Sequence, residues 1–280
     1  MPEYDPVRPP VALTVAGSDS GGGAGIQADL SAMTAHGVFG TAVVTATTAQ
    51  NTRGVEDVHP VPADHVASQY AAVADDFDVA AIKTGMLATA EIVETVTGAV
   101  ADARVPLVVD PVMVAATGDR LLSPAAEEAY EDLIAAATLV TPNADEAEVL
   151  TDEPVETPAD AERAGRELVA LGADAALVKG GHLADDDGAT GETVVDTLVR
   201  AGGKEGAIEV DRFESPRIDT DATHGSGCAL SSAVAARLAR GEPLRGAVEK
   251  AVGEMSEAVR RGYDVGGGPG AVNPTMLGGE

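Results

Sequence analysis

Short apolar segments with strand character alternate along the chain with segments of helical spacing, and this alternation is what most restricts the fold. Strands with few polar positions, joined by helices, predict a parallel sheet covered on both faces. We therefore expect an α/β fold in three layers, with a mostly parallel central sheet between helices. Strands are predicted at 11–16, 42–47, 79–83, 107–110, 139–140 and 175–179, with a strand pair at 193–199 and 207–213, and helices at 25–35, 62–73, 89–103, 126–137, 159–171, 227–240 and 243–262.

No long linker and no internal repeat divides the 280 residues, so one domain spanning 1–280 is expected. It would carry a short N-terminal extension at 1–10 and a flexible C-terminal tail from about 266 to 280. The acidic cluster at 185–188 reads as an exposed turn.

The charge balance is strongly acidic. Asp and Glu total 46 against 18 Lys and Arg, giving a formal net charge of −28, and only four residues are lysines. Such a surface repels nucleic acids and anionic membranes, so we expect neither as a partner. The acidic residues are scattered among apolar segments, which argues against disorder. A halophile's salt-rich cytoplasm would suit this surface, with an ordinarily acidic mesophilic protein as the alternative.

Cysteine usage and the N-terminus bear on the compartment. A single cysteine, Cys228, permits no intramolecular disulfide, as is usual in a reducing interior. Residues 1–10 lack an apolar signal core, and no apolar run is long enough to span a membrane. The expected location is the cytoplasm.

Polar and glycine-rich residues follow nearly every predicted strand. In open α/β sheets, ligands bind beyond the carboxyl ends of the strands. Packing alone does not explain so regular a pattern, and a ligand site at this edge of the sheet is therefore expected. The segments concerned are 17–25, 50–52, 83–86, 110–113, 143–146 and 179–182.

The run from Thr223 to Cys228 precedes an apolar helix and contains two glycines. The free N–H groups and partial positive charge of a helix N-terminus bind phosphate-like anions, which predicts an anion hole at Gly225, Ser226, Gly227 and Cys228. The same field should lower the pKa of Cys228. The alternatives are a connecting turn and a small buried cysteine without chemistry. The run matches neither a Walker A loop nor a dinucleotide fingerprint.

Taken together, the motifs resemble those of the hydroxymethylpyrimidine/phosphomethylpyrimidine kinases of thiamine biosynthesis, in the ribokinase-like superfamily. The resemblance extends from about residue 11 to residue 273, with Ser226 and Gly22 as small departures from the usual pattern. The motifs that carry it are AGSDS at 16–20, GAGIQAD at 23–29, AQNT at 49–52, KTGML at 83–87, DPVM at 110–113, TPN at 141–143, KGGH at 179–182 and THGSGC at 223–228.

This resemblance implies a ribokinase-like sandwich and a bifunctional enzyme that uses ATP and Mg²⁺. Its small-molecule substrate would be 4-amino-5-hydroxymethyl-2-methylpyrimidine, phosphorylated first to the monophosphate and then to the diphosphate. The family also suggests a homodimer, and we expect no fused thiamine-phosphate synthase domain. Two alternative functions remain open. One is a pyridoxal or pyridoxine kinase on the same fold, and the other is a catalytically silent ligand-binding or regulatory domain. A sugar kinase fits less well, because cysteine replaces the aspartate expected there.

The resemblance places the pyrimidine near Gly17, Asp29, Gln50 and Met86. The Gln50 amide both donates and accepts hydrogen bonds, as the edge of an aminopyrimidine requires. The Met86 side chain would cover the ring with a polarizable surface. Alternatively, Gln50 is a turn amide and Met86 belongs to the core.

For the nucleotide, the resemblance implies Lys179, Thr223, Asn143 and Glu146. Asn143 and Glu146 would position Mg²⁺ through water, since this ion prefers oxygen ligands and keeps its waters. Alternatively, Asn143 caps the helix that carries Glu146.

Cys228 is the candidate base for the first phosphorylation, where it would take the hydroxymethyl proton. Asp110 is the second candidate, as a base or as a group that positions the metal. The acceptor of the second phosphorylation is already ionised, so that step should depend less on Cys228.

Overall fold

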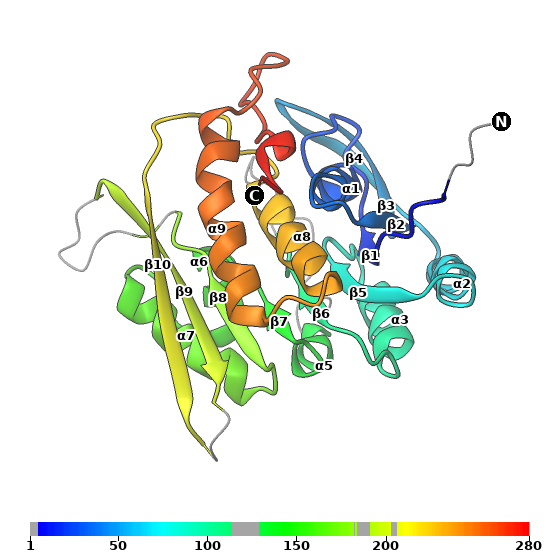
Figure 1. Cartoon of the computed structure of the whole chain (residues 1–280), viewed down its shortest axis with the longest axis horizontal. Coiled ribbons are helices and arrows are strands. Elements are labelled where there is room, and N and C mark those ends of the chain that lie inside the picture. The colour runs from blue at the N-terminus through cyan, green and yellow to red at the C-terminus, as the bar shows by residue number, and fades with distance from the viewer. Residues whose placement is uncertain (1–4, 114–128, 182, 184–190, 203–205, 280) are drawn as a thin grey trace.

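The computed structural model describes residues 5–113, 129–181, 183, 191–202 and 206–279 (Figure 1). His182, the predicted turn at 185–188 and the first part of the predicted helix 126–137 lie outside these residues. Among the described residues, no helix has the length and apolar character needed to span a membrane.

An eight-stranded sheet forms the middle layer, in the order β10-β9-β8-β7-β6-β5-β1-β2. The strands from β8 to β2 pair in parallel, and β9 is antiparallel to both of its neighbours. The mostly parallel sheet and the predicted strand pair are therefore confirmed, and the structure places the pair at one edge of the sheet. The strands are β1 (Val11–Ala16), β2 (Phe39–Val44), β5 (Val79–Thr84), β6 (Leu107–Val109), β7 (Leu139–Val140), β8 (Ala175–Val178), β9 (Thr193–Ala201) and β10 (Ile208–Pro216).

Helices cover both faces of this sheet, as predicted. One layer consists of α1 (Gly25–Ala35), α8 (Ser226–Ala239) and α9 (Leu244–Arg260) (Figure 1). Because neighbouring side chains on a strand point to opposite faces, Val108 packs in this layer while Leu107 and Val109 pack in the other. The helices of the opposite side are α2 (Ala63–Ala74), α3 (Ala90–Val100), α5 (Tyr130–Ala135), α6 (Ala144–Thr151) and α7 (Pro158–Ala170).

The predicted strand at 42–47 is wrong in its bounds, because the chain leaves the sheet in the middle of it. Thr45 separates β2 from β3 (Ala46–Asn51), and its hydroxyl donates to the carbonyl of Met86 at 2.6 Å. β3 pairs in antiparallel fashion with β4 (Gly54–Pro60) as a separate two-stranded hairpin. Gln50 therefore stands on a hairpin strand and does not follow a strand of the sheet.

The C-terminal segment, expected as a flexible tail, packs against the domain. The N–H of Asn273 donates to the carbonyl of Ala258 at 3.0 Å, and Val272 and Leu277 are buried. A short 3₁₀ helix, η1 (Pro274–Met276), contacts α1 and α9.

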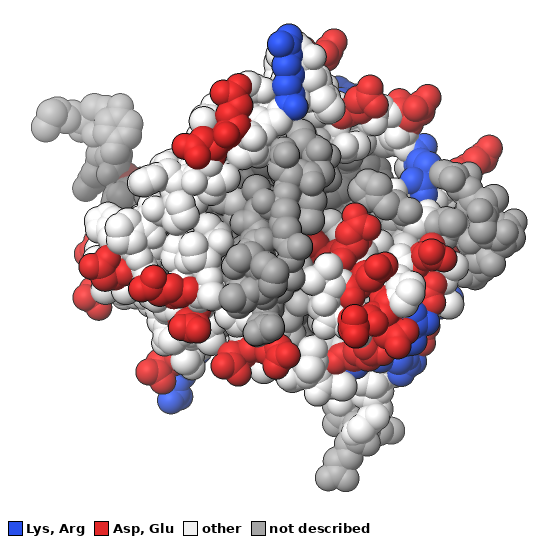
Figure 2. All heavy atoms as spheres, turned by 180° about the vertical axis from the view of Figure 1, so that it is seen from behind, with Lys and Arg blue, Asp and Glu red and all other residues white. Residues whose placement is uncertain are grey.

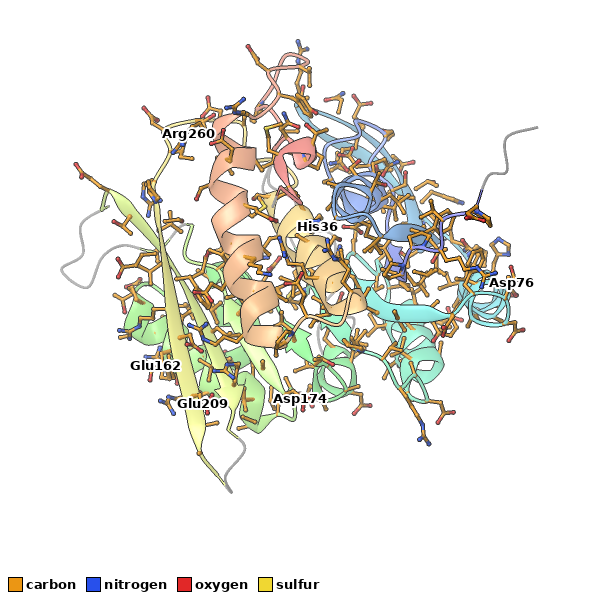
Figure 3. All side chains as sticks on the ribbon, viewed as in Figure 1. His36, Asp76, Glu162, Asp174, Glu209 and Arg260 are labelled. Atoms are coloured by element: carbon orange, nitrogen blue, oxygen red, sulfur yellow. The ribbon has the colours of Figure 1, made fainter. Side chains whose placement is uncertain are left out.

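Charged side chains lie mostly on the outside of the domain. Figure 3 labels several at its periphery, among them Glu162 and Glu209, and Figure 2 shows one face with many Asp and Glu but few Lys and Arg. His36 is different, because it is buried and its Nε2 lies 3.0 Å from Glu254 Oε2.

Candidate active site

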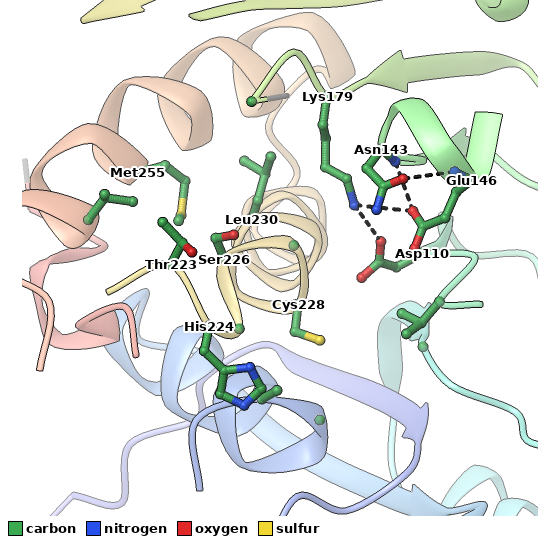
Figure 4. Close-up of a pocket in the computed structure, with 18 of the residues that line it drawn as sticks. Asp110, Asn143, Glu146, Lys179, Thr223, His224, Ser226, Cys228, Leu230 and Met255 are labelled. Atoms are coloured by element: carbon green, nitrogen blue, oxygen red, sulfur yellow. Dashed lines mark hydrogen bonds and ion pairs between the residues drawn. The ribbon is translucent and has the colours of Figure 1, made fainter. Parts of the chain in front are cut away.

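A cavity of about 540 Å³ runs along the carboxyl edge of the sheet and continues past the start of α8 (Figure 4). It brings together almost every site residue expected from the sequence. Its lining includes Gly17, Gln50, Met86, Asp110, Asn143, Glu146, Lys179, Thr223, Gly225, Ser226, Gly227 and Cys228.

The anion loop, residues 223–228, leads directly into α8. Gly225 is the residue before the helix, and its φ of 78° lies in the left-handed region that favours glycine. A Cβ on Gly225 would also collide with the carbonyl oxygen of Gly23. No side chain caps this helix. The N–H of Ser226 donates to the carbonyl of Thr223 at 3.1 Å, so the N–H groups of Gly227 and Cys228, two residues that line the cavity, are the ones suited to a phosphate.

Cys228 stands in the first turn of α8, at the wall of the cavity, and accepts a hydrogen bond from the N–H of Gly25 at the start of α1. Burial raises the pKa of the Cys228 thiol to about 11, although the nearby charge of Lys83 acts in the opposite direction. The predicted lowering of this pKa is therefore wrong. A helix terminus stabilises a charge by about 0.3–1 kcal/mol, less than one pKa unit, and desolvation outweighs it here.

Opposite Cys228, a buried group of charges forms the other wall of the cavity (Figure 4). Lys179 Nζ lies 3.0 Å from Asp110 Oδ1 and 3.7 Å from Glu146 Oε2. Burial opposes the ionisation of Asp110, but Lys179 and Lys83 outweigh it and hold the Asp110 pKa below its usual range. Burial raises the pKa of Glu146 to about 7, helped by the charge of Asp110. The ammonium group of Lys179 thus lies close to two carboxyl groups whose pKa values are shifted in opposite directions.

Asn143 does cap a helix. Its side-chain oxygen accepts from the N–H of Glu146, and Glu146 accepts from the N–H of Asn143, both at 2.8 Å. This capping box fixes both side chains at the start of α6. Because both residues also line the cavity, the cap holds oxygen atoms beside Lys179.

The far end of the cavity is built around Gly17 and Met86. The N–H of Gly17 donates to the Met86 carbonyl at 3.1 Å, and a Cβ on Gly17 would collide with the Met86 methyl group. Gln50 reaches this end from the hairpin. The hydroxyl of Ser20 accepts from the backbone N–H of Gln50 and donates to the backbone carbonyl of Gln50. The glycine loop, residues 17–25, thereby holds both residues in position.

Asp29 does not line the cavity and is fully buried. Its carboxylate lies 2.9 Å and 3.0 Å from Lys83 Nζ and also accepts from Thr14 and Ser232. The position on the inner face of α1 explains this, since it directs the side chain toward the sheet and α8. Asp29 is thus placed as the partner of Lys83, which itself lines the cavity floor.

Two further features of the site were missed from the sequence. Asp19 accepts from the N–H groups of Gly21, Gly23 and Ala24, and its Oδ2 lies 3.0 Å from His224 Nε2, so it ties the glycine loop to the anion loop. An acidic residue inside a glycine-rich run was the available signal. The second is an apolar end of the cavity, lined by Ile218, Leu230, Val252, Met255 and Val259.

A family model described as phosphomethylpyrimidine kinase matches residues 19–273. The chain belongs to this family. A hydroxymethylpyrimidine/phosphomethylpyrimidine kinase from Streptomyces coelicolor is 46% identical, over 96% of this chain and 95% of its own. The resemblance inferred from the sequence motifs is thereby confirmed.

Solved structures agree with the family fold. A phosphomethylpyrimidine kinase from Clostridium difficile is 38% identical with a TM-score of 0.74, covering 89% of this chain and 99% of its own. A pyridoxal kinase from Bacillus subtilis, solved as an ADP complex, is 31% identical with a TM-score of 0.83, covering 96% of this chain and 98% of its own. The expected α/β fold class is confirmed.

Proposed function

We propose that this member of the phosphomethylpyrimidine kinase family transfers the γ-phosphoryl group of ATP to 4-amino-5-hydroxymethyl-2-methylpyrimidine and then to the resulting monophosphate. The observation that carries this proposal is a single cavity that joins Met86 and Gln50 to the anion loop and to Lys179. The name of the Streptomyces relative covers both phosphorylations.

The pyrimidine would lie between Met86 and Gln50, with the Gln50 amide on its polar edge. The nucleotide would enter from the opposite side. Its phosphates would meet Lys179, Thr223 and the N–H groups of the anion loop, and its base would lie at the apolar end of the cavity. The ADP complex of the pyridoxal kinase supports a nucleotide site on this fold.

In the first step, the hydroxymethyl oxygen forms a bond to the γ-phosphorus while the bond from that phosphorus to the β-phosphate oxygen breaks, and ADP leaves. The alcohol proton passes to the thiolate form of Cys228, which has first lost its own proton to solvent, and the neutral thiol results. Asp110 is the weaker candidate for this base, because its pKa is lowered and Lys179 occupies one of its oxygens. The anion loop and Lys179 stabilise the charge spread over the phosphoryl oxygens.

The second step differs in its acceptor. A phosphate monoester is already ionised near neutral pH, so no alcohol proton has to be removed before it attacks. The same anion loop and Lys179 would serve this transfer without help from the Cys228 sulfur.

The residues present fit Mg²⁺ that arrives with the nucleotide. Within the described residues, no group of three or more His, Cys, Asp or Glu side chains could hold a metal ion by itself. Asn143 and Glu146 line the cavity, and their oxygen atoms would hold Mg²⁺ through its waters. When bound, the ion would neutralise charge on the transferring phosphates.

Phosphorus NMR of a reaction that contains the hydroxymethylpyrimidine and ATP tests the proposal. We expect the monophosphate to appear first and the diphosphate to follow, with both reactions stopping when the metal is chelated. Binding of ATP without any product would instead support the silent ligand-binding domain.

Pyridoxal kinase activity is the second candidate, favoured by the TM-score of 0.83 to the Bacillus enzyme. The sequence identity to the Streptomyces pyrimidine kinase, 46%, is higher than the 31% to the Bacillus pyridoxal kinase, and this favours the pyrimidine as the substrate. Cytoplasmic location, the homodimer and adaptation to high salt stay predictions from the sequence.

A further inference from the structure

The segment 266–272 follows α9 as a loop that contacts the β3–β4 hairpin (Figure 1). Its neck is closed by Tyr263 and Ala271, whose backbones pair in both directions at 2.7 Å and 3.1 Å. At its tip, the N–H groups of Gly267 and Gly268 both donate to Thr52 Oγ1, at 3.2 Å and 3.1 Å. One hydroxyl on the hairpin turn thus receives two bonds from the segment.

The contact at the tip is close enough to require glycine at position 268. A Cβ on Gly268 would collide with the backbone carbonyl of Thr52, whereas one on Gly267 would meet the guanidinium of Arg53, which can move aside. The tip therefore lies directly on the hairpin backbone.

The base of the same segment pairs with the anion loop. The N–H of His224 donates to the carbonyl of Gly270 at 3.2 Å, and the N–H of Val272 donates to the carbonyl of His224 at 3.0 Å. Residues 266–272 thus contact the hairpin at one end and the anion loop at the other.

These two contacts join the halves of the cavity. Thr52 stands two residues after Gln50, which faces the pyrimidine end, and His224 stands four residues before Cys228, which faces the phosphate end. We propose that residues 266–272 act as a strap that holds the pyrimidine-binding hairpin in register with the anion loop, and that Thr52 is its positioning residue. This inference rests on the proposed function.

Other hydrogen bonds also connect the segments around the cavity. Ser20 joins the glycine loop to Gln50, and Asp19 joins that loop to His224. Because these connections stay in place when the strap is loosened, the fold should survive. The expected defect is therefore in the alignment of the pyrimidine with the phosphate.

Thr52→Val removes the acceptor of both strap bonds while keeping the β-branched shape. We expect the KM for the hydroxymethylpyrimidine to rise about three- to tenfold, which corresponds to the loss of about one hydrogen bond. The dissociation constant for ADP should change less than about twofold, because the nucleotide contacts lie on the other side of the cavity. Thr52→Ser, which keeps the hydroxyl, should restore the KM.

Thr47→Val is the matched control. Thr47 is exposed on the same hairpin, and its side chain makes no hydrogen bond within the described residues. This control should leave both constants unchanged. If Thr52→Val behaves like Thr47→Val, or weakens pyrimidine and ADP equally, the strap proposal is wrong. If the wild-type protein does not phosphorylate the pyrimidine at all, the proposed function fails instead.

Hydrogen–deuterium exchange gives a second test that needs no variant. The pyrimidine should slow exchange in peptides covering 264–277 together with those covering the hairpin, and ADP alone should slow it less. Slower exchange in the hairpin without any change in 264–277 would overturn the proposal.

Discussion

At the scale of single residues, the Cys228 sulfur connects the acid–base chemistry to the anion site. Its pKa of about 11 leaves it a neutral thiol near pH 7, so the thiolate is a scarce but strong base. As long as the pH is below this pKa, each increase of one pH unit raises the thiolate fraction about tenfold. The first phosphorylation should therefore accelerate as the pH rises through the neutral range.

Cys228→Ala tests this assignment. The variant keeps the N–H groups of the anion loop but lacks the sulfur, so the first phosphorylation should fall by about 10²–10⁴-fold and lose its rise with pH. The second should fall far less, because its acceptor is already ionised. Separate single-turnover rates for the two acceptors give the comparison. Equal losses would mean that Cys228 shapes the pocket, and no loss in either would assign the base to Asp110.

Gly17 sets the width of the pyrimidine end. In Gly17→Ala the new methyl group displaces the end of the Met86 side chain, which is flexible and can move, so the change alters the pyrimidine end of the cavity more than the stability of the fold. We expect the KM for the pyrimidine to rise about tenfold or more, with ADP affinity unchanged, as measured by initial rates and by calorimetry. Gly98→Ala is the control, since a Cβ there meets nothing within 4 Å. A normal KM in Gly17→Ala would place the pyrimidine elsewhere.

At the scale of elements, the alternation of strands and helices was enough to predict the sheet and its two helical layers. The β3–β4 hairpin was missed because its residues are polar or half exposed and carry no clear apolar alternation. Asp29 was misplaced for a related reason. A motif shows that a residue belongs to the site region, but only the path of α1 decides whether the side chain faces the cavity or Lys83.

The junction of the glycine loop with the start of α8 should be essential to both phosphorylations. Gly225→Ala introduces a side chain at a φ of 78° and against Gly23, so the anion loop cannot keep its shape. Both rates should fall together, by about 10²-fold or more. Gly241→Ala, at the other end of α8, has a similar φ of 81° but open space, and should lose about 1–2 kcal/mol of stability while staying active. Similar activity in the two variants would contradict this role for the junction.

At the scale of the whole molecule, the charge of −28 should make stability depend on salt. Repulsion among surface carboxylates extends over the screening length, which is about 10 Å in 0.1 M salt and about 3 Å in 1 M salt. The melting temperature should therefore rise by about 5 °C or more between 0.1 M and 2 M KCl, at about 2–4 °C per kcal/mol. Thermal melts across a KCl series measure this. A flat or falling series would remove the halophilic interpretation.

The most direct test of the proposed function compares three acceptors in molar KCl with ATP and Mg²⁺: the hydroxymethylpyrimidine, its monophosphate and pyridoxal. We expect both pyrimidines to be phosphorylated, each with a kcat/KM above that of pyridoxal. A kcat/KM for pyridoxal above those of both pyrimidines would contradict it.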